Sequence, residues 1–153
     1  MTDYVLGFAF CKDYAGFNRV LLIRKKKPVW QAGKLNGVGG KIELTDLTVY
    51  DAMSREFKEE TGLDSESTAW KRFAIMEFPE ARVHCFTTVF IWKEFKRARS
   101  TTDELLEDYQ FDERFLEKMQ HRDALPNLSW LVPMAHAAWW STLPTLLIEE
   151  LRQ

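Results

Sequence analysis

The sequence predicts one domain of the α/β class, in which a mixed β-sheet lies between layers of helices. The chain has 153 residues, a length that suits one domain of ordinary size. Its apolar residues gather in short β-rich stretches, and two or three helical patterns stand among them without strict alternation. We find no internal repeat and no low-complexity linker, so we expect a single domain over residues 1–153.

The first third of the chain predicts two strands and a glycine-rich segment. Residues Tyr4–Cys11 and Arg19–Ile23 are apolar and β-rich, and Gly16 between them marks a hairpin turn. Residues Lys34–Glu43 contain three glycines and predict a loop that leads into a short extended segment.

The most distinct helical pattern covers Thr48–Thr61. Thr48 is a good N-cap, and Asp51 follows three residues later, as in a capping box. Apolar residues recur at the helical period within this stretch, at Val49, Ala52, Met53 and Phe57. Gly62 follows the last turn, where a glycine commonly ends a helix.

The second half of the chain predicts two strands, a long polar loop and two helices. In order, these are the strands Trp70–Phe78 and Val83–Trp92, the loop Lys93–Asp108, and the helices Phe111–Gln120 and Met134–Leu151. Pro144 should kink or interrupt the last helix, because proline lacks the backbone N–H that a helix needs.

Charge and composition limit the classes of partner. The net charge is −2 and the pI is about 6.0, so no global basic surface recruits nucleic acid or a membrane. An anionic substrate must therefore meet local positive charge or a bound metal ion. We expect no membrane association and no stable nucleic-acid partner, and either a monomer or a homodimer.

The compartment is predicted from the cysteines and from the first residues. Cys11 and Cys85 lie in separate apolar stretches, which predicts two buried free thiols in a reducing compartment. The start of the chain has no basic region, which predicts no signal peptide. The apolar stretch Trp130–Trp140 is too short to span a bilayer. We expect a cytoplasmic protein.

Three glutamates on the predicted helix carry the strongest chemical signal. Glu56, Glu59 and Glu60 are spaced i, i+3, i+4, which places their carboxylates on one face. A divalent cation such as Mg²⁺, with Mn²⁺ as a substitute, would remove their mutual repulsion. The alternative is a solvated charged face that Arg55 and Lys58 neutralise.

The flanking residues make this pattern more specific. The run from Arg55 to Leu63, Arg-Glu-Phe-Lys-Glu-Glu-Thr-Gly-Leu, follows an upstream Gly39-Gly40-Lys41-Ile42-Glu43. Together they resemble the Nudix box, the signature of the Nudix hydrolases. Two departures stand out: Asp46 occupies the place of the first Glu of the box, and the gap from Asp46 to Arg55 is one residue longer. We place the extra residue in the loop before Thr48.

The resemblance implies a Nudix-type α/β/α sandwich with a catalytic loop–helix–loop, and Mg²⁺-dependent hydrolysis of a nucleoside diphosphate linked to another group. It also implies that Glu56, Glu59 and Glu60 bind metal with the Gly40 carbonyl, while Arg55 orients a carboxylate. Nudix enzymes often add one acid from a later loop. Glu104 is the preferred candidate for this catalytic and metal-binding acid. Asp103 and Glu107 compete with it, as does an ordinary acidic loop.

Phosphate contacts are predicted from basic residues near the glycines. Arg24 belongs to the cluster Ile23–Pro28 that ends a strand near the glycine segment, although a solvated strand end explains this cluster equally well. Lys41 lies beside Gly40 and is the better placed of the two.

Base contacts are predicted from two later segments that resemble MutT-like members of the family. In the first, Phe78 would stack on a base and Arg82 would bind its edge; the alternative is that Phe78 is a core residue. In the second, Leu125–Ala135, the amide of Asn127 offers a donor and an acceptor to a purine. Its alternative is a turn or cap residue.

The preferred interpretation is a MutT-like enzyme that hydrolyses a (d)NTP, including an oxidised purine dNTP such as 8-oxo-dGTP, to a nucleoside monophosphate and pyrophosphate. A second interpretation is an ADP-ribose or dinucleotide pyrophosphatase. A third is a non-catalytic Nudix domain that senses a ligand or binds a protein, and the retained Glu56, Glu59 and Glu60 argue against it.

Overall fold

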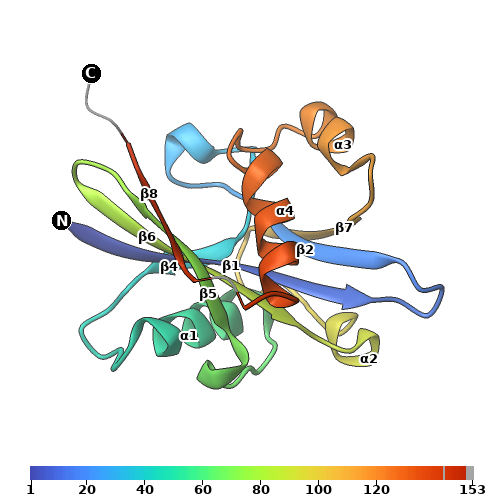
Figure 1. Ribbon diagram of the computed structural model, residues 1–153, viewed down its shortest axis with the longest axis horizontal. Helices are drawn as coiled ribbons and strands as arrows, with labels where there is room; N and C mark the ends of the chain where they lie inside the picture. Colours follow the sequence, from blue (N-terminus) through green and yellow to red (C-terminus); the bar gives the residue numbers. More distant parts are fainter. Residues whose placement is uncertain (143, 151–153) are drawn as a thin grey trace.

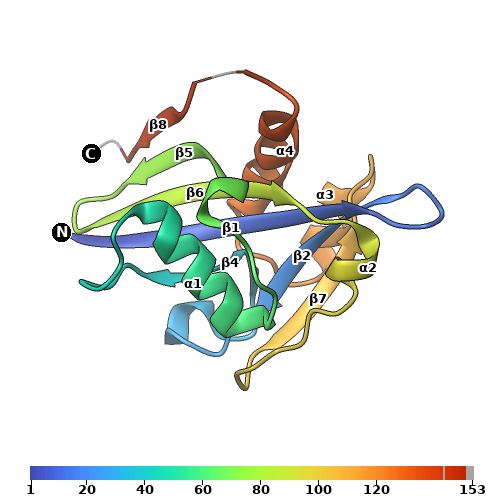
Figure 2. The same cartoon turned by 90° about the horizontal axis from the view of Figure 1, so that it is seen from below.

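The centre of the fold is an eight-stranded mixed sheet with helices on both faces (Figures 1 and 2). The structure, a computed structural model, describes residues 1–142 and 144–150. Helix α1 (Val49–Thr61) covers one face of the sheet, while α3 (Phe115–His121) and α4 (Leu128–Trp139) cover the other. The predicted α/β/α architecture is therefore confirmed.

The sheet combines antiparallel and parallel pairs. In chain order, its strands are β1 (Thr2–Lys12), β2 (Asn18–Arg24), β3 (Leu35–Asn36), β4 (Val38–Lys41), β5 (Lys71–Glu77), β6 (Ala81–Val89), β7 (Leu105–Gln110) and β8 (Leu146–Glu149). Their spatial order is β3-β2-β1-β6-β5-β8, with β4 paired to β1 and β7 paired to β2. The pairs β1–β6 and β5–β8 are parallel and the other named pairs are antiparallel.

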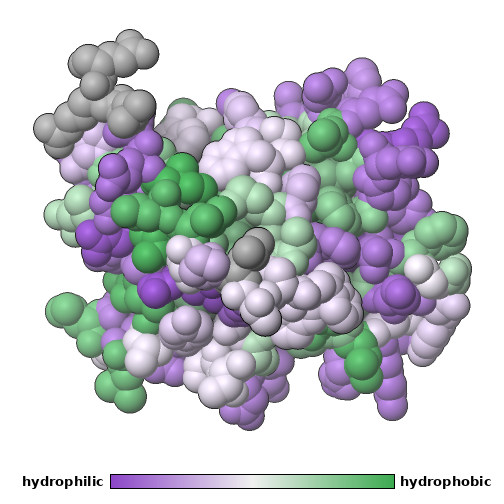
Figure 3. Space-filling view, viewed as in Figure 1, coloured by the Kyte–Doolittle hydropathy of each residue, from purple (hydrophilic) through white to green (hydrophobic). Residues whose placement is uncertain are grey.

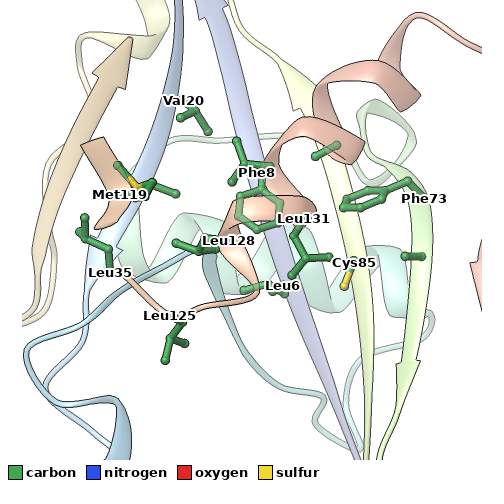
Figure 4. Close-up of a cluster of buried hydrophobic side chains, with 14 of the residues drawn as sticks. Leu6, Phe8, Val20, Leu35, Phe73, Cys85, Met119, Leu125, Leu128 and Leu131 are labelled. Carbon is green, nitrogen blue, oxygen red and sulfur yellow. The ribbon is translucent and has the colours of Figure 1, made fainter. Parts of the chain in front are cut away.

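Alternation along β1 divides the core into two clusters. Leu6, Phe8 and Phe10 pack under α3 and α4, in a cluster that Figure 4 shows. Val5 and Ala9 point to the opposite face, because successive side chains of a strand alternate. There they meet a second cluster that includes Met53 and Phe57 of α1. Cys11 and Cys85 are free and buried, as the sequence predicts.

Helix α1 begins and ends as its sequence predicts. The Thr48 hydroxyl accepts a hydrogen bond from the Asp51 N–H at 3.1 Å and caps the first turn. At the other end, Gly62 adopts a left-handed conformation with φ of 75° and donates its N–H to the Lys58 carbonyl. These two caps fix the ends of the helix that carries the three glutamates.

The predicted loop Lys93–Asp108 is wrong in two places. A short helix, α2 (Trp92–Phe95), follows β6, which ends at Val89 rather than at Trp92. Strand β7 then pairs antiparallel with β2 from Arg19 to Arg24. The pattern of β7 is polar because it covers a sheet edge and buries none of its side chains completely.

The predicted helix Met134–Leu151 is also wrong, although its end at Leu151 lies outside the described residues. Helix α4 begins six residues earlier, at Leu128, and contains Pro133. It is followed by β8, which pairs parallel with β5. Both shifts have tertiary causes, because α4 buries Leu128, Leu131 and Val132 against the sheet while β8 pairs with the edge of β5.

Strand β8 leaves Leu146 and Leu147 about half exposed. Figure 3 shows an apolar patch over the same part of the molecule where Figure 1 labels β8. The remaining short elements are two turns of 3-10 helix, η1 (Val29–Gln31) and η2 (Ser67–Ala69). The helix predicted over Phe111–Gln120 begins at Phe115 instead. Within the described residues, no helix is both long and apolar enough to cross a membrane.

Candidate active site

Arg55 organises the exposed side of the glutamate cluster. Its guanidinium makes a bidentate ion pair with Asp46, at 2.8 Å from Nε and 2.7 Å from Nη2. It also donates to the Glu56 carboxylate at 2.9 Å and to the Lys41 carbonyl at 3.1 Å. The Arg55 guanidinium holds the pKa of the Asp46 carboxyl below its usual range. Asp46 therefore ties the loop before α1 to the helix.

The three glutamates differ in their surroundings. The Glu59 side chain is 53% exposed and lies 3.2 Å from the Arg55 guanidinium. Glu56 and Glu60 are 9% and 8% exposed. They lie close to the backbone of β4, where a Cβ at Gly40 would stand 2.5 Å from the Glu56 carboxyl carbon. A glycine at position 40 is what allows the helix to come so near.

Burial raises the proton affinity of these two carboxyls. Together with its charged neighbours it raises the pKa of Glu60 to about 7: burial is the largest cause, Lys25 lowers the pKa, and the Glu56 and Glu104 carboxylates raise it. Burial also raises the pKa of Glu56, against the effect of Arg55. The cluster holds more buried carboxyls than its nearby cations neutralise, which favours a bound cation.

Glu104 joins this buried pair from the segment just before β7. It is 4% exposed and lies just before β7, where the Lys26 N–H donates to one carboxylate oxygen at 2.6 Å. The Lys25 ammonium donates to the other at 3.2 Å. The competing acids do not approach: Asp103 is exposed and faces Lys26, and Glu107 pairs with Arg24.

The donor set fits a divalent cation, although its final arrangement is not preformed. Among the described residues, no three His, Cys, Asp or Glu side chains already converge on one point. Glu59 is turned toward Arg55, and Glu104 is held by Lys25. The Glu60 carboxylate accepts one long bond, from the Gly39 N–H at 3.4 Å. Oxygen ligands with this little compensation suit Mg²⁺, which prefers carboxylates and water.

A cavity of about 690 Å³ opens beside these acids. Its walls combine the glycines of β4, basic residues after β2, and aromatic and amide side chains. They include Lys25, Trp30, Asn36, Gly39, Gly40, Phe78 and Asn127. The side-chain oxygen of Asn127 is buried and has no hydrogen-bond partner within the described part of the chain. A buried carbonyl without a donor is costly, which makes it a ready acceptor for a ligand.

The glycine strand, the capped glutamate helix and the cavity agree with a family comparison. The NUDIX domain model matches residues 5–131, well over half of the chain. The chain belongs to the NUDIX domain family. Among curated proteins, no sequence matches it.

Solved structures confirm the Nudix fold at low sequence identity. A MutT/nudix family protein from Enterococcus faecalis is 19% identical with a TM-score of 0.62, over 72% of this chain and 43% of that one. The NUDIX domain of Shewanella oneidensis NrtR, complexed with ADP ribose, is 12% identical with a TM-score of 0.67, over 90% and 87%. A C. elegans Ap4A hydrolase is 13% identical with a TM-score of 0.65, over 92% and 98%. The family and these neighbours support a hydrolase.

Within this Nudix domain, three residues predicted to bind substrate do not line the cavity. Arg24 pairs with Glu107 at 2.5 Å and donates to the Gly33 carbonyl, so it ties β2 to β7 and to a loop. Ala81 and Val83 of β6 line the cavity, while Arg82 between them points to the opposite face of the strand. There Arg82 pairs with Glu77 at 3.0 Å. Lys41 is exposed at the end of β4. By contrast, Phe78 and Asn127 do line it.

Lys25, Trp30 and Asn36 are polar or aromatic residues of the cavity wall that were not singled out from the sequence. Lys25 belongs to the basic cluster at the end of β2. The alternation of side chains along a strand could have distinguished it from Arg24. Arg24 and Lys25 are adjacent and so point in different directions. Trp30 is 65% exposed in the one-turn helix η1, a degree of exposure that is informative for so large an apolar side chain.

Proposed function

We propose that this Nudix domain, as a single-domain enzyme, hydrolyses a nucleoside triphosphate to a nucleoside monophosphate and pyrophosphate with Mg²⁺. The family acts on nucleoside diphosphate derivatives, and a (d)NTP, including an oxidised purine dNTP, is the substrate that we favour within that class. One observation carries the proposal. The same cavity is lined by Gly39 and Gly40, which lie against the Glu56 and Glu60 carboxylates, and by Asn127. The buried side-chain oxygen of Asn127 has no hydrogen-bond partner among the described residues.

Each wall of the cavity suits a different part of such a substrate. Gly39 and Gly40 bring the phosphate side close to Glu56 and Glu60, and Lys25 supplies positive charge there. Phe78 and Trp30 offer apolar rings that are 39% and 65% exposed, which suits stacking against a base. Asn127 would accept a hydrogen bond from an N–H at the base edge.

The residues that would hold the metal are Glu56, Glu60 and Glu104, with Glu59 after it turns from Arg55. When bound, the ion neutralises phosphate charge and acidifies a water molecule. Arg55 keeps Glu56 oriented through its bond at 2.9 Å, and Asp46 keeps Arg55 in place. A buried carboxylate of the cluster would take the proton of the attacking water.

A substrate panel with Mg²⁺ tests the proposal. Purified protein is given canonical and oxidised (d)NTPs, ADP-ribose and dinucleoside polyphosphates, and the release of pyrophosphate and of phosphate is measured separately. We expect pyrophosphate release from a nucleoside triphosphate, with the highest kcat/KM for a purine. Faster cleavage of ADP-ribose or of a dinucleotide would replace this substrate by the second candidate.

The same panel tests the third interpretation, a non-catalytic domain. Nucleotide binding without any metal-dependent hydrolysis, measured by calorimetry and product release on the same preparation, would support it. A triple variant of Glu56, Glu59 and Glu60 to Gln serves as the blank, because it removes the carboxylates and preserves side-chain size.

A further inference from the structure

Lys25 is a largely buried cation, and its contact with the acids of the cluster goes beyond the positive charge that the proposed function assigns to it. It lies directly after β2, and its backbone is fixed on both sides by bonds to Lys34 and Gly33. Its side chain is 14% exposed, and its ammonium lies 3.2 Å from the Glu104 carboxylate, which is 5% exposed. Burial of an ammonium group at such a depth is tolerated only when a partner compensates its charge.

The acids around Lys25 outnumber the charge that it supplies. Lys25 contacts Glu104 directly, and Lys25, Glu56 and Glu104 are charged neighbours of Glu60. Arg55, the other cation at this end of α1, is already engaged by Asp46 and by the exposed side of the cluster. Lys25 therefore serves as the main positive charge facing Glu60 and Glu104, at the place where a divalent cation would bind.

Lys25 also lines the cavity, together with Gly39 and Gly40. Lysine carries its charge on a flexible four-carbon stem, so its ammonium can turn from a carboxylate to a nearby anion without a backbone shift. Its neighbour Lys26 differs, because that side chain is 58% exposed and faces the exposed Asp103 at 3.5 Å.

We propose that Lys25 is an exchangeable counter-ion: it neutralises Glu104 and Glu60 in the metal-free enzyme and turns to a substrate phosphate once a divalent cation replaces it. This inference rests on the proposed function, since it assumes a metal ion and a phosphorylated substrate in this cavity. Lys25 acts as a competitor of the metal in one state and as a phosphate ligand in the other.

The test compares Lys25→Met with wild type in two measurements. Calorimetric titration of the metal-free protein with MgCl₂ or MnCl₂ should show binding that is about tenfold tighter, because a positive charge that competes with the ion is gone. Steady-state kinetics of nucleotide hydrolysis should show a KM raised by about tenfold and a smaller change in kcat, as expected when a ground-state phosphate contact is lost. Metal-free Lys25→Met should also unfold at lower urea concentration.

Two further variants isolate the cause. Lys26→Met removes the same charge one residue later, at an exposed position, and should leave the metal affinity within about twofold of wild type. Lys25→Arg keeps a cation and should keep metal affinity and KM near wild type. If Lys25→Met does not fold, Lys25→Gln gives the same readouts.

Metal binding that is unchanged or weaker in Lys25→Met overturns the inference, because a residue that merely positions Glu104 would weaken the site when lost. That failure leaves the proposed function standing if wild type still hydrolyses nucleotides with Mg²⁺. If wild type neither binds Mg²⁺ nor hydrolyses any nucleotide, the proposed function fails and this inference fails with it.

Discussion

The acidic end of the cavity and its aromatic wall are built in opposite ways. At the acidic end, Asp46, Arg55 and Glu56 are joined by several bonds of 2.7 to 2.9 Å. Along the aromatic wall, Trp30 and Phe78 are 65% and 39% exposed, and the Asn127 oxygen has no partner among the described residues. Asp46, Arg55 and Glu56 are therefore held together before any ligand arrives, although Glu59 and Glu104 contact Arg55 and Lys25 rather than a metal ion, and the aromatic wall is left open.

From this difference we expect the acidic end to carry out the reaction and the aromatic wall to select the nucleotide. Preorganised charges lower the barrier of a reaction because they need no rearrangement when charge develops. Unpaired groups contribute little until a matching ligand satisfies them, and they then discriminate strongly against ligands that cannot. We therefore expect substitutions at the acidic end to reduce turnover, and substitutions along the wall to change which nucleotide is preferred.

The largest effect is expected for Glu59→Gln. The change keeps the shape of the side chain but removes one negative ligand of the proposed metal site, so turnover should fall by ~10²-fold or more. Metal-free stability should stay the same or rise, since one member of a repulsive cluster is gone. The assays are pyrophosphate release and thermal unfolding with and without Mg²⁺, and the mutant should gain less from the ion than wild type.

Glu66→Gln is the matched control for Glu59→Gln, because Glu66 is exposed and lies outside the cavity. It should keep wild-type turnover. A Glu59→Gln enzyme that works at the wild-type rate would mean that the exposed side of the cluster is an ordinary solvated helix face.

A smaller effect, of another kind, is expected for Asn127→Leu. Loss of the amide should lower kcat/KM for the preferred nucleotide by about 10- to 100-fold, the range of one to two lost hydrogen bonds to a buried group. The unliganded protein should become more stable, because an unpaired buried oxygen is gone. Ser129→Ala, in an exposed position on the same helix, is the control. Equal losses for every nucleotide would contradict a role of Asn127 in selectivity.

Gly40→Ala tests the closeness of α1 to β4. The added Cβ would lie 2.5 Å from the Glu56 carboxyl carbon, so we expect a loss of about 1–3 kcal/mol in the free energy of unfolding, measured in urea, together with weaker Mg²⁺ binding. Gly16→Ala meets open space and pays only for its φ of 85°, so it should cost about 1 kcal/mol and spare metal binding. Equal metal affinity in both variants would mean that the close approach of α1 to Gly40 does not affect the metal site.

The smallest effect is expected at His84, which lies outside both regions. It concerns the pH dependence of the free energy of unfolding. Burial lowers the pKa of His84 below its usual value, Arg72 lowers it further, and Asp3 opposes them. The folded state therefore favours the neutral imidazole ring of His84. The stability that this neutral ring contributes is present above about pH 6.5 and is lost as the pH falls. Urea unfolding between pH 5 and 7.5 should show a flatter profile for His84→Gln than for wild type. A steeper profile would reverse the assigned direction.

Local spacing determined the acidic end almost completely. The cap at Thr48, the glutamates at i, i+3 and i+4 and the glycine at Gly62 all act within a few residues, so their geometry follows from the sequence. Glu104, the acid preferred among those of the loop, is the one that lies buried near Glu60, for a long-range reason: the Lys25 ammonium and the Lys26 N–H hold it. Its role stays a prediction.

Only the tertiary structure decided the rest. The polar segment after β6 becomes β7 because β2 offers a free edge, and the chain after Pro144 becomes β8 because β5 offers another. The direction of Lys25 into the cavity, rather than of Arg24, depends in the same way on which face of β2 is covered. A strand pairs with, and a cavity is lined by, residues that are far away in the chain. The pattern of neighbouring residues therefore does not predict which segments will meet.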